Sequence, residues 1–429
     1  MNRRNFLKTA AVTAAAGMAG GSSAALAAPK GADELTAAEK AAIRNYTPDM
    51  RYRRMGSTGV MVSALGFGML RLPMLEDRKT VNEAATIEML RYGIDNGINY
   101  VDTARGYLGG QSETAVGMAL AGGWRDRVWL ATKLTLSALK SDADFERMFD
   151  LSRKQLNTDV IDFYLLHHVT EKTWRENMVP YRAIEKIMKL KEQGKIRYAG
   201  FSFHDSLPFF KQVLDANPGW DFCQLMENYL DTEYEAGFLG MKMAYERGMA
   251  VNVMEPLKAG MLTRLPKEVR ALFDASGRKR TAVEWAFDYL YTLPEPGVVI
   301  SGMSSVAHVK ENIEYAKRSH VGMLDWQDRV TIGKAAHLWR TMPGVSPCTA
   351  CANCMPCHND VDIARLIGHV WFSYKLTGNL DAAKRYYTHV PPPRGVSAEA
   401  CDFCGECVPR CPEHVDIVGI LKEMRGLMA

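Results

Sequence analysis

The sequence predicts a two-domain α/β protein: a TIM (β/α)8 barrel followed by a small, mainly helical domain that is rich in cysteine. The chain has 429 residues, which is longer than a single hydrophobic core usually supports. Short β-branched runs alternate with amphipathic runs from Val60 to about Lys317, the pattern of repeated βα units around a parallel sheet. Eight of the nine cysteines lie between Cys348 and Cys411, so a second, chemically distinct domain is expected there.

Residues 1–28 have the pattern of an export leader. A basic start is followed by an Ala-rich run and an A-x-A cleavage signal at residues 25–27. The start also resembles the twin-arginine export motif R-R-x-F-L-K, in Arg3, Arg4, Phe6, Leu7 and Lys8. The alternative is a membrane anchor, but residues 9–28 are rich in Ala, Gly, Ser and Thr and are weakly apolar for a bilayer span. We expect leader removal, no stable membrane insertion afterwards, a periplasmic or otherwise exported protein, and a linker at residues 29–50.

Residues 51–323 are predicted to form the barrel. Apolar residues recur at three and four positions in the helical runs Ile87–Asn96, Phe145–Leu156, Ala183–Gln193 and Val306–Lys317. The eight candidate strands are Ala64–Gly68, Asn99–Thr103, Val128–Lys133, Ile161–His167, Tyr198–Ser202, Phe222–Met226, Ala250–Met254 and Val298–Ser301. In such barrels functional groups gather at the C-terminal ends of the strands, so polar residues there are the first candidates for a site.

Four positions at or just after these strand ends carry groups suited to acid–base chemistry. Asp102 lies at the end of the second candidate strand, Tyr107 in the loop after it, Lys133 at the end of the third and His167 at the end of the fourth. Taken singly, each has a simpler structural interpretation as an ion pair, a loop aromatic or a core histidine. His168 is expected to point to the other side from His167, because side chains alternate along a strand.

The segments around these residues resemble consecutive signatures of the aldo/keto reductases: Y-V-D-T-A-R-G-Y at 100–107, L-A-T-K at 130–133, D-F-Y-L-L-H at 162–167 and G-F-S at 200–202. The resemblance implies an oxidoreductase that moves a hydride between NAD(P) and a small-molecule carbonyl or alcohol. It also implies that Tyr107 donates the proton, that Lys133 with Asp102 adjusts the pKa of Tyr107, and that His167 orients the carbonyl. A free phenol has a pKa of about 10, which a nearby ammonium is expected to lower. Because all four family positions are filled, four coincident structural residues are the weaker interpretation.

The same resemblance implies a nicotinamide nucleotide site. The matching positions are Ser202, Gln224 and Asn228 at the carboxamide end and Ser304, Glu311 and Asn312 at the adenosine end. Three departures accompany them. Phe203 replaces an asparagine, Met254 or Glu255 stands where an aromatic residue normally stacks, and Gly302 and His308 replace the basic pair that meets a 2′-phosphate. NAD and NADP therefore both stay open.

The cysteine-rich domain is predicted at residues 347–429, after a connecting helix and linker at 324–346. Its two runs are Cys348-x2-Cys351-x2-Cys354-x2-Cys357 and Cys401-x2-Cys404-x2-Cys407-x3-Cys411-Pro412. The second run resembles the bacterial ferredoxin run, whose fourth cysteine binds the other cluster in two-cluster ferredoxins. The resemblance implies two [4Fe-4S] clusters, one on Cys348, Cys351, Cys354 and Cys411 and the other on Cys401, Cys404, Cys407 and Cys357. Two four-thiolate zinc sites are the alternative, and this spacing is less typical of zinc.

Two functional hypotheses follow from the sequence. The first is an exported NAD(P)-linked oxidoreductase with a small-molecule carbonyl substrate, two [4Fe-4S] clusters for electron transfer and a redox protein partner. The second is an exported electron-transfer or scaffold protein with a non-catalytic barrel and redox or structural clusters. The net charge of +4 forms no basic cluster with interleaved aromatics, which argues against a nucleic-acid partner.

Overall fold

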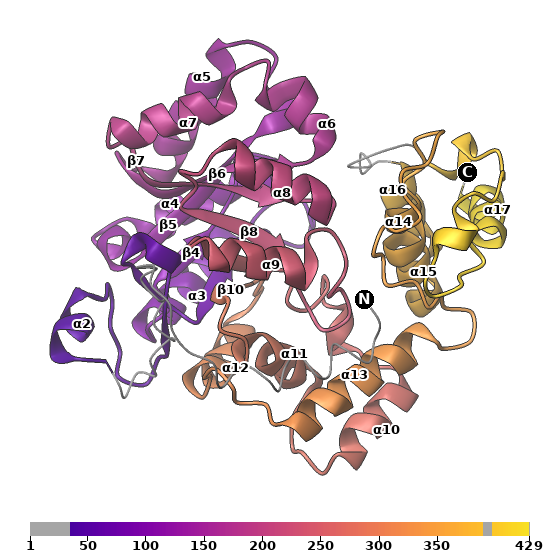
Figure 1. The fold of residues 1–429 in the computed structure, drawn as a ribbon. Helices are drawn as coiled ribbons and strands as arrows, with labels where there is room; N and C mark the ends of the chain where they lie inside the picture. Colours follow the sequence, from indigo (N-terminus) through magenta and orange to yellow (C-terminus); the bar gives the residue numbers. More distant parts are fainter. Residues whose placement is uncertain (1–34, 389–396, 429) are drawn as a thin grey trace, which may run out of the picture.

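The computed structural model describes residues 35–388 and 397–428. The predicted leader at residues 1–28, and the linker residues 29–34, lie outside the described residues. The predicted barrel is confirmed: eight parallel strands form a closed sheet (Figure 1). In barrel order the strands are β10 (Pro296–Ser301), β3 (Leu65–Gly68), β4 (Tyr100–Asp102), β5 (Trp129–Thr135), β6 (Ile161–Val169), β7 (Ile196–Phe203), β8 (Phe222–Met226) and β9 (Ala250–Met254).

Amphipathic helices follow the strands and cover the outside of the barrel. They are α3 (Glu83–Asp95), α4 (Gln111–Leu120), α5 (Ala143–Leu156), α7 (Ala183–Glu192), α8 (Leu207–Ala216), α9 (Gly237–Glu246), α11 (Ala282–Tyr291) and α12 (Val306–Lys317). Helix α8 illustrates the pattern, because it buries Phe209, Phe210, Val213 and Leu214 on one face. Its start is stabilised by Ser206, whose hydroxyl accepts a hydrogen bond from the Phe209 amide.

A short hairpin closes the N-terminal end of the barrel. Strands β1 (Tyr52–Arg54) and β2 (Met61–Ser63) pair in antiparallel fashion, and the turn η2 (Gly56–Thr58) between them packs on the start of β9. Gly56 has φ +51°, and a Cβ there would lie 2.4 Å from the Ala250 nitrogen. Only glycine tolerates both that backbone conformation and that close approach. The short helix α2 (Ala37–Ala42) precedes the hairpin.

The C-terminal domain is small and mainly helical, as predicted. It contains α14 (Ile363–Arg365), η8 (Leu366–Trp371), α15 (Phe372–Thr377), α16 (Leu380–Thr388) and α17 (Ile417–Met428). These elements enclose a core of their own that includes Val361, Leu366, Leu421 and Met424. Helix α13 (Trp326–Arg340) connects the barrel to this domain and packs against α10 (Lys267–Ala275), which belongs to the segment after β9.

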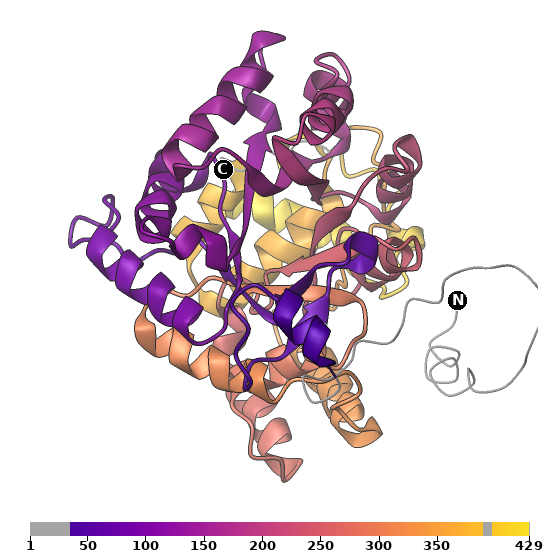
Figure 2. The same cartoon turned by 90° about the vertical axis from the view of Figure 1, so that its left-hand side faces the viewer.

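The C-terminal domain and the N-terminal helix α2 flank opposite ends of the barrel. They lie at opposite sides of the molecule in Figure 1, and in Figure 2 the C-terminal domain is behind the barrel while α2 is in front of it. The C-terminal domain therefore faces the end of the barrel where the strands finish and the loops carry polar residues. Within the described residues, no helix has both the length and the apolar character needed to cross a bilayer.

Candidate active site and cluster ligands

A buried ion pair lies at the centre of the barrel mouth. Lys133 in β5 donates a hydrogen bond to Asp102 at the end of β4, with 2.5 Å between Nζ and Oδ2. Lys133 also donates to the Thr103 carbonyl at 2.8 Å. The Lys133 side chain is 0% exposed and that of Asp102 is 2% exposed, so the ammonium is held in place by the protein and not by water.

Tyr107 and His167 complete the predicted group of four. The Lys133 ammonium lies 4.8 Å from the centre of the Tyr107 ring, and the Tyr107 and His167 rings meet edge to face with 5.7 Å between their centres. The turn η3 (Tyr107–Gly110) brings the phenol back over the strand ends, with Leu108 in the left-handed region at φ +52°. The structure therefore brings Asp102, Tyr107, Lys133 and His167 together.

Burial decides the protonation states in this group. Burial raises the pKa of Tyr107, and the nearby Lys133 ammonium does not offset that effect. The predicted lowering of the Tyr107 pKa is therefore wrong in direction, because the phenol lies deep in the mouth. Burial alone lowers the pKa of Lys133, but Asp102 and Tyr107 more than compensate, so the ammonium persists. Burial, with Lys133 contributing, holds the pKa of His167 well below 6.5, so its imidazole is neutral.

The end of β6 departs from regular strand geometry. Its pairing with β7 shifts register between Leu166 and Val169, and His168 has φ +63°. The strict alternation expected of His168 is therefore interrupted, and its ring stacks on His204, just after β7, with 4.4 Å between ring centres. Such irregularities re-aim side chains near sites. Nδ1 of His204 is in turn 3.2 Å from Oε1 of Glu235. The sequence pattern did not single out this pair, although the position of His204 directly after a barrel strand could have indicated it.

At the predicted carboxamide end, Ser202 and Gln224 are buried at the ends of β7 and β8. The Ser202 hydroxyl accepts a hydrogen bond from the His168 amide at 2.8 Å, which leaves its proton free to be donated. The Gln224 amide nitrogen lies 3.8 Å from the Met254 sulfur, and its oxygen has no hydrogen-bond partner among the described residues. A buried amide with an unused oxygen fits a ligand that carries an amide of its own.

Asn228 serves the loop after β8. Its side-chain oxygen accepts from the amides of Leu230 and Asp231, and its nitrogen donates to the Asp231 carboxylate at 3.0 Å and to the Glu255 carbonyl at 3.3 Å. These four bonds use the full hydrogen-bonding capacity of the amide. Asn228 is therefore engaged within the protein, close to but apart from Ser202 and Gln224.

Of the three residues predicted at the adenosine end, Ser304 lies just before α12, and Glu311 and Asn312 lie in the middle of that helix. Ser304 is exposed and within 3.3 Å of the His308 imidazole. Glu311 accepts a hydrogen bond from the Tyr315 hydroxyl, and Asn312 is buried and donates to Ser301 at 3.1 Å. Ser304 and Glu311 are thus the exposed members of this trio, which a ligand can reach directly, whereas Asn312 is buried and braces the end of β10.

An arginine that the sequence analysis did not identify lies beside these residues. Arg71, in the loop after β3, packs against Gly302: a Cβ at Gly302 would be 2.9 Å from the Arg71 Cγ. The Arg71 side chain is otherwise exposed. The sequence showed that a basic residue is missing at Gly302. It could not show that Arg71 lies beside that position, because the two loops are far apart in the chain.

The eight clustered cysteines form two groups around two cavities. The first cavity is lined by Cys348, Cys351, Cys354 and Cys411. The second is lined by Cys357, Cys401, Cys404 and Cys407, and Cys354 also reaches it. Four thiols around one small cavity are the donor set that a [4Fe-4S] cluster requires, so the residues present fit two such clusters.

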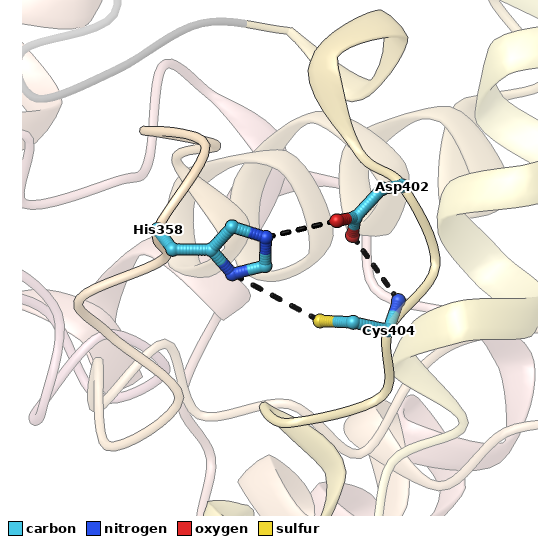
Figure 3. Close-up of side chains that lie close together, drawn as sticks. All are labelled: His358, Asp402 and Cys404. Carbon is cyan, nitrogen blue, oxygen red and sulfur yellow. Dashed lines mark hydrogen bonds and ion pairs between the residues drawn. The ribbon is translucent and has the colours of Figure 1, made fainter.

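A polar group borders the second cavity. His358 donates to Asp402 with 2.9 Å between Nε2 and Oδ2, and its other ring nitrogen is 4.0 Å from the Cys404 sulfur (Figure 3). All three side chains are exposed, and Cys404 is the exposed member of the eight clustered cysteines. Because Cys404 already belongs to a set of four cysteines, His358 and Asp402 form the polar surroundings of that set.

A (β/α)8 barrel with a tyrosine, a lysine, an aspartate and a histidine assembled at its mouth, joined to a domain with two four-cysteine sites, defines a class of redox protein. Comparison with known families agrees. The model of the aldo/keto reductase family matches residues 64–321, and the chain belongs to this oxidoreductase family. A 4Fe-4S dicluster domain matches residues 347–415, and a twin-arginine translocation signal matches residues 1–20, so the protein carries the signal for export by that pathway.

Individual relatives show how far the similarity extends. Aldo-keto reductase YhdN of Bacillus subtilis is 36% identical over 162 residues, which are 36% of this chain and 47% of that protein, so the chain spans about half of its length. The holo form of an aldo-keto reductase from Bacillus halodurans has a TM-score of 0.56 and 27% identity, over 67% of this chain and 96% of that one. An aldo/keto reductase from Klebsiella pneumoniae in complex with NADP and acetate has a TM-score of 0.53 and 24% identity, over 66% and 94% of the two chains, and shares the fold.

Proposed function

We propose that the protein is an exported, NAD(P)-linked oxidoreductase that interconverts a carbonyl and an alcohol, with two [4Fe-4S] clusters for electron transfer. The observation that carries this proposal is the meeting of Tyr107, His167 and the buried Lys133–Asp102 pair at the barrel mouth. Each member has a separate task in carbonyl reduction.

In this mechanism the chain's own residues position the substrate and move one proton. His167, neutral because its pKa is low, donates a hydrogen bond to the substrate carbonyl oxygen and orients it. Tyr107, protonated because burial raises its pKa, transfers its phenolic proton to that oxygen as negative charge develops. Lys133, fixed by Asp102, stabilises the phenolate that is left. When bound, the nicotinamide supplies or accepts the hydride and the clusters exchange single electrons.

Ser202 and Gln224 are proposed to hold the carboxamide of the nucleotide. The unpartnered Gln224 oxygen and the free Ser202 proton support this assignment. Ser304, Glu311 and Asn312 are proposed to form the adenosine end, and Asn228 to support the loop after β8 through its hydrogen bonds with Leu230 and Asp231. Arg71 is proposed to meet a phosphate of the nucleotide, since it lies against Gly302, where the expected basic side chain is missing.

The domain limits proposed for this activity are 29–50 for the linker, 51–323 for the barrel, 324–346 for the connection and 347–429 for the cluster domain. The proposed cluster ligands are Cys348, Cys351, Cys354 and Cys411 for the first cluster and Cys357, Cys401, Cys404 and Cys407 for the second. Their grouping around two cavities supports this division. A small-molecule carbonyl compound is the proposed substrate, and a redox protein is the proposed partner.

A second candidate is an electron-transfer or scaffold protein with a barrel that no longer turns over. It is favoured by Met254, which ends β9 where the family normally stacks an aromatic residue, and by Gly302 and His308 in place of the basic pair. Under this hypothesis nicotinamide nucleotides do not bind, and the Lys133–Asp102 pair is purely structural.

Anaerobically purified protein separates the two candidates. Iron and sulfide are quantified first, and NADH and NADPH are then titrated and tested with a panel of aldehydes. The proposed enzyme binds one nucleotide saturably, and Tyr107→Phe lowers turnover on the order of 10²–10⁴-fold without loss of nucleotide binding. Tyr386→Phe, at a half-exposed tyrosine in the cluster domain, is the matched control and retains turnover. No binding at millimolar nucleotide would favour the scaffold.

A further inference from the structure

The first cysteine loop touches the barrel beside the proposed nucleotide site. Met226 at the end of β8, Tyr234 in the loop that follows and Ala350 of the cluster domain form one buried apolar group. Met254 at the end of β9 and Cys348 both pack against this same group. The first of the two cysteine sets is therefore joined to the barrel mouth by van der Waals contact.

Met254 is the barrel residue in this group that also reaches the proposed nucleotide site. Its sulfur lies 3.8 Å from the Gln224 amide nitrogen, so one methionine contacts both Gln224 and the apolar group around Ala350. A methionine is flexible and polarizable, and it adapts its packing when a neighbour moves. Since Gln224 is proposed to bind the carboxamide, a bound nucleotide would engage the residue that Met254 supports.

A polar connection runs beside the apolar one. Arg340 at the end of α13 donates hydrogen bonds to the carbonyl of Leu230 in the loop after β8 and to the carbonyl of Cys348. Asp231 lies 3.8 Å from Arg340 and 2.6 Å from Lys258, which belongs to the loop after β9. Lys258, Asp231 and Arg340 are all buried. The loop that carries Cys348 is thus tied to the loop after β8, the strand that contains Gln224, and through Asp231 to the loop after β9.

The second cysteine set has different surroundings. Cys404 is exposed, and the side chains of His358, Asp402 and Glu406 around it are between 45% and 64% exposed. Both cavities are lined by residues of the C-terminal domain, but Cys348 of the first set packs against the group formed by Met226, Tyr234 and Ala350, and no cysteine of the second set does so among the described residues. This set faces solvent, whereas the Cys348 loop faces the barrel.

We propose that Met254 couples nucleotide binding in the barrel to the first cluster, held by Cys348, Cys351, Cys354 and Cys411, and leaves the second cluster unaffected. The inference rests on the proposed function, because it requires a nucleotide at Gln224. It assigns different roles to two sites that look equivalent in sequence: one responds to the barrel, and the other faces an external partner. By linkage, a nucleotide that shifts the potential of a cluster must bind with different affinity to the oxidised and reduced protein.

The test uses full-length protein with both clusters, prepared anaerobically. Midpoint potentials of the two clusters are measured by electron paramagnetic resonance with and without saturating NADP⁺ or NAD⁺, and nucleotide affinity is measured calorimetrically on the oxidised and the reduced protein. We expect one potential to move and the other to stay, with about a tenfold difference in affinity, which equals about 59 mV for a one-electron couple. His358→Ala identifies the second cluster, because it changes the surroundings of that cluster alone.

Met254→Ala should abolish the shift while iron content and both resonance signals persist, and Met254→Leu, which keeps the volume, should retain most of it. Val408→Ala, on the exposed side near Cys404, is the matched control and should retain the full shift. Nucleotide binding with no shift, or with equal shifts in both clusters, overturns the coupling and leaves the proposed function intact. Absence of nucleotide binding overturns both, and the calorimetry distinguishes these results.

Discussion

Replacement of Asp102 by asparagine should destabilise the barrel strongly. The substitution keeps the shape of the side chain but removes the negative charge that faces Lys133 at 2.5 Å. Both side chains are almost completely buried, so water cannot take over the role of the carboxylate. Lys133 would keep its hydrogen bond to the Thr103 carbonyl, but that oxygen carries a partial negative charge and not a full one.

The size of the effect follows from the distance and the burial. At 2.5 Å and an effective dielectric constant of about 20, Coulomb's law gives an attraction of about 7 kcal/mol between the two charges. Part of this is recovered when the lysine loses its proton, and breaking a buried pair from one side typically costs about 3–5 kcal/mol. We expect a loss in that range for Asp102→Asn. The double variant with Lys133→Met should lose much less than the two single variants together, because it leaves no buried charge.

The assay is urea unfolding followed by tryptophan fluorescence, with the four-protein cycle measured at one pH. Lys242→Ala, which removes one member of an exposed pair on α9, serves as the control and should leave the midpoint unchanged. A loss below about 1 kcal/mol for Asp102→Asn, or additive effects in the double variant, would refute the claim that a buried ion pair organises the mouth.

Three further predictions concern the proposed activity. His167 is neutral and Tyr107 protonated at pH 7, so kcat/KM for reduction should show no inflection near pH 6.5. It should also show no midpoint of decline at or below pH 10, the ordinary pKa of a phenol, because burial raises the pKa of Tyr107 above that value. Cys404→Ala should lose roughly half of the iron and one of two resonance signals, measured by metal analysis and spectroscopy. Arg71→Ala should weaken NADPH about tenfold or more and NADH less, measured as dissociation constants, because a charge-assisted phosphate contact is worth about 1.5–3 kcal/mol.

Each of these has an outcome that contradicts it. A rise in kcat/KM between pH 6 and 7 would show that the imidazole of His167 titrates in the ordinary range. Full iron retention in Cys404→Ala would remove that cysteine from the ligand set. Equal weakening of NADPH and NADH in Arg71→Ala would place the guanidinium near the pyrophosphate that the two share and not near the 2′-phosphate.

Much of the barrel could be predicted from local pattern. Strands β8 and β9 and helix α12 match their predicted ranges, because turn residues border each of them closely in the sequence. Helix α3 begins before the predicted Ile87 because Asn82 caps it by accepting from the Ala85 amide, and that polar first turn lacks the apolar spacing on which the prediction relied. The β1–β2 hairpin was not predicted, since its short strands are stabilised by contact with β10 and its turn η2 by contact with β9, both distant in sequence.

The sequence predicted which residues form the site, but not their protonation behaviour. The family pattern placed Asp102, Lys133 and His167 at the ends of successive strands and Tyr107 in the loop after Asp102, and the structure brings the four together. The direction of the Tyr107 pKa shift was wrong, because a pKa depends on how much of the surrounding volume excludes water. The position of His168 escaped prediction because one irregular residue in β6 cancels the alternation of the strand.

The sequence by itself determined the elements whose cause is local: the alternation of strands and helices, the two cysteine runs and the leader motif all depend on residues a few positions apart. Tertiary structure alone decided which thiols share a cavity, how deeply the phenol is buried and that the Cys348 loop packs beside Met254. The physical reason is that hydrogen bonds and turns act over short stretches of chain, whereas burial and contact between domains are set by the packing of surfaces that are distant in sequence.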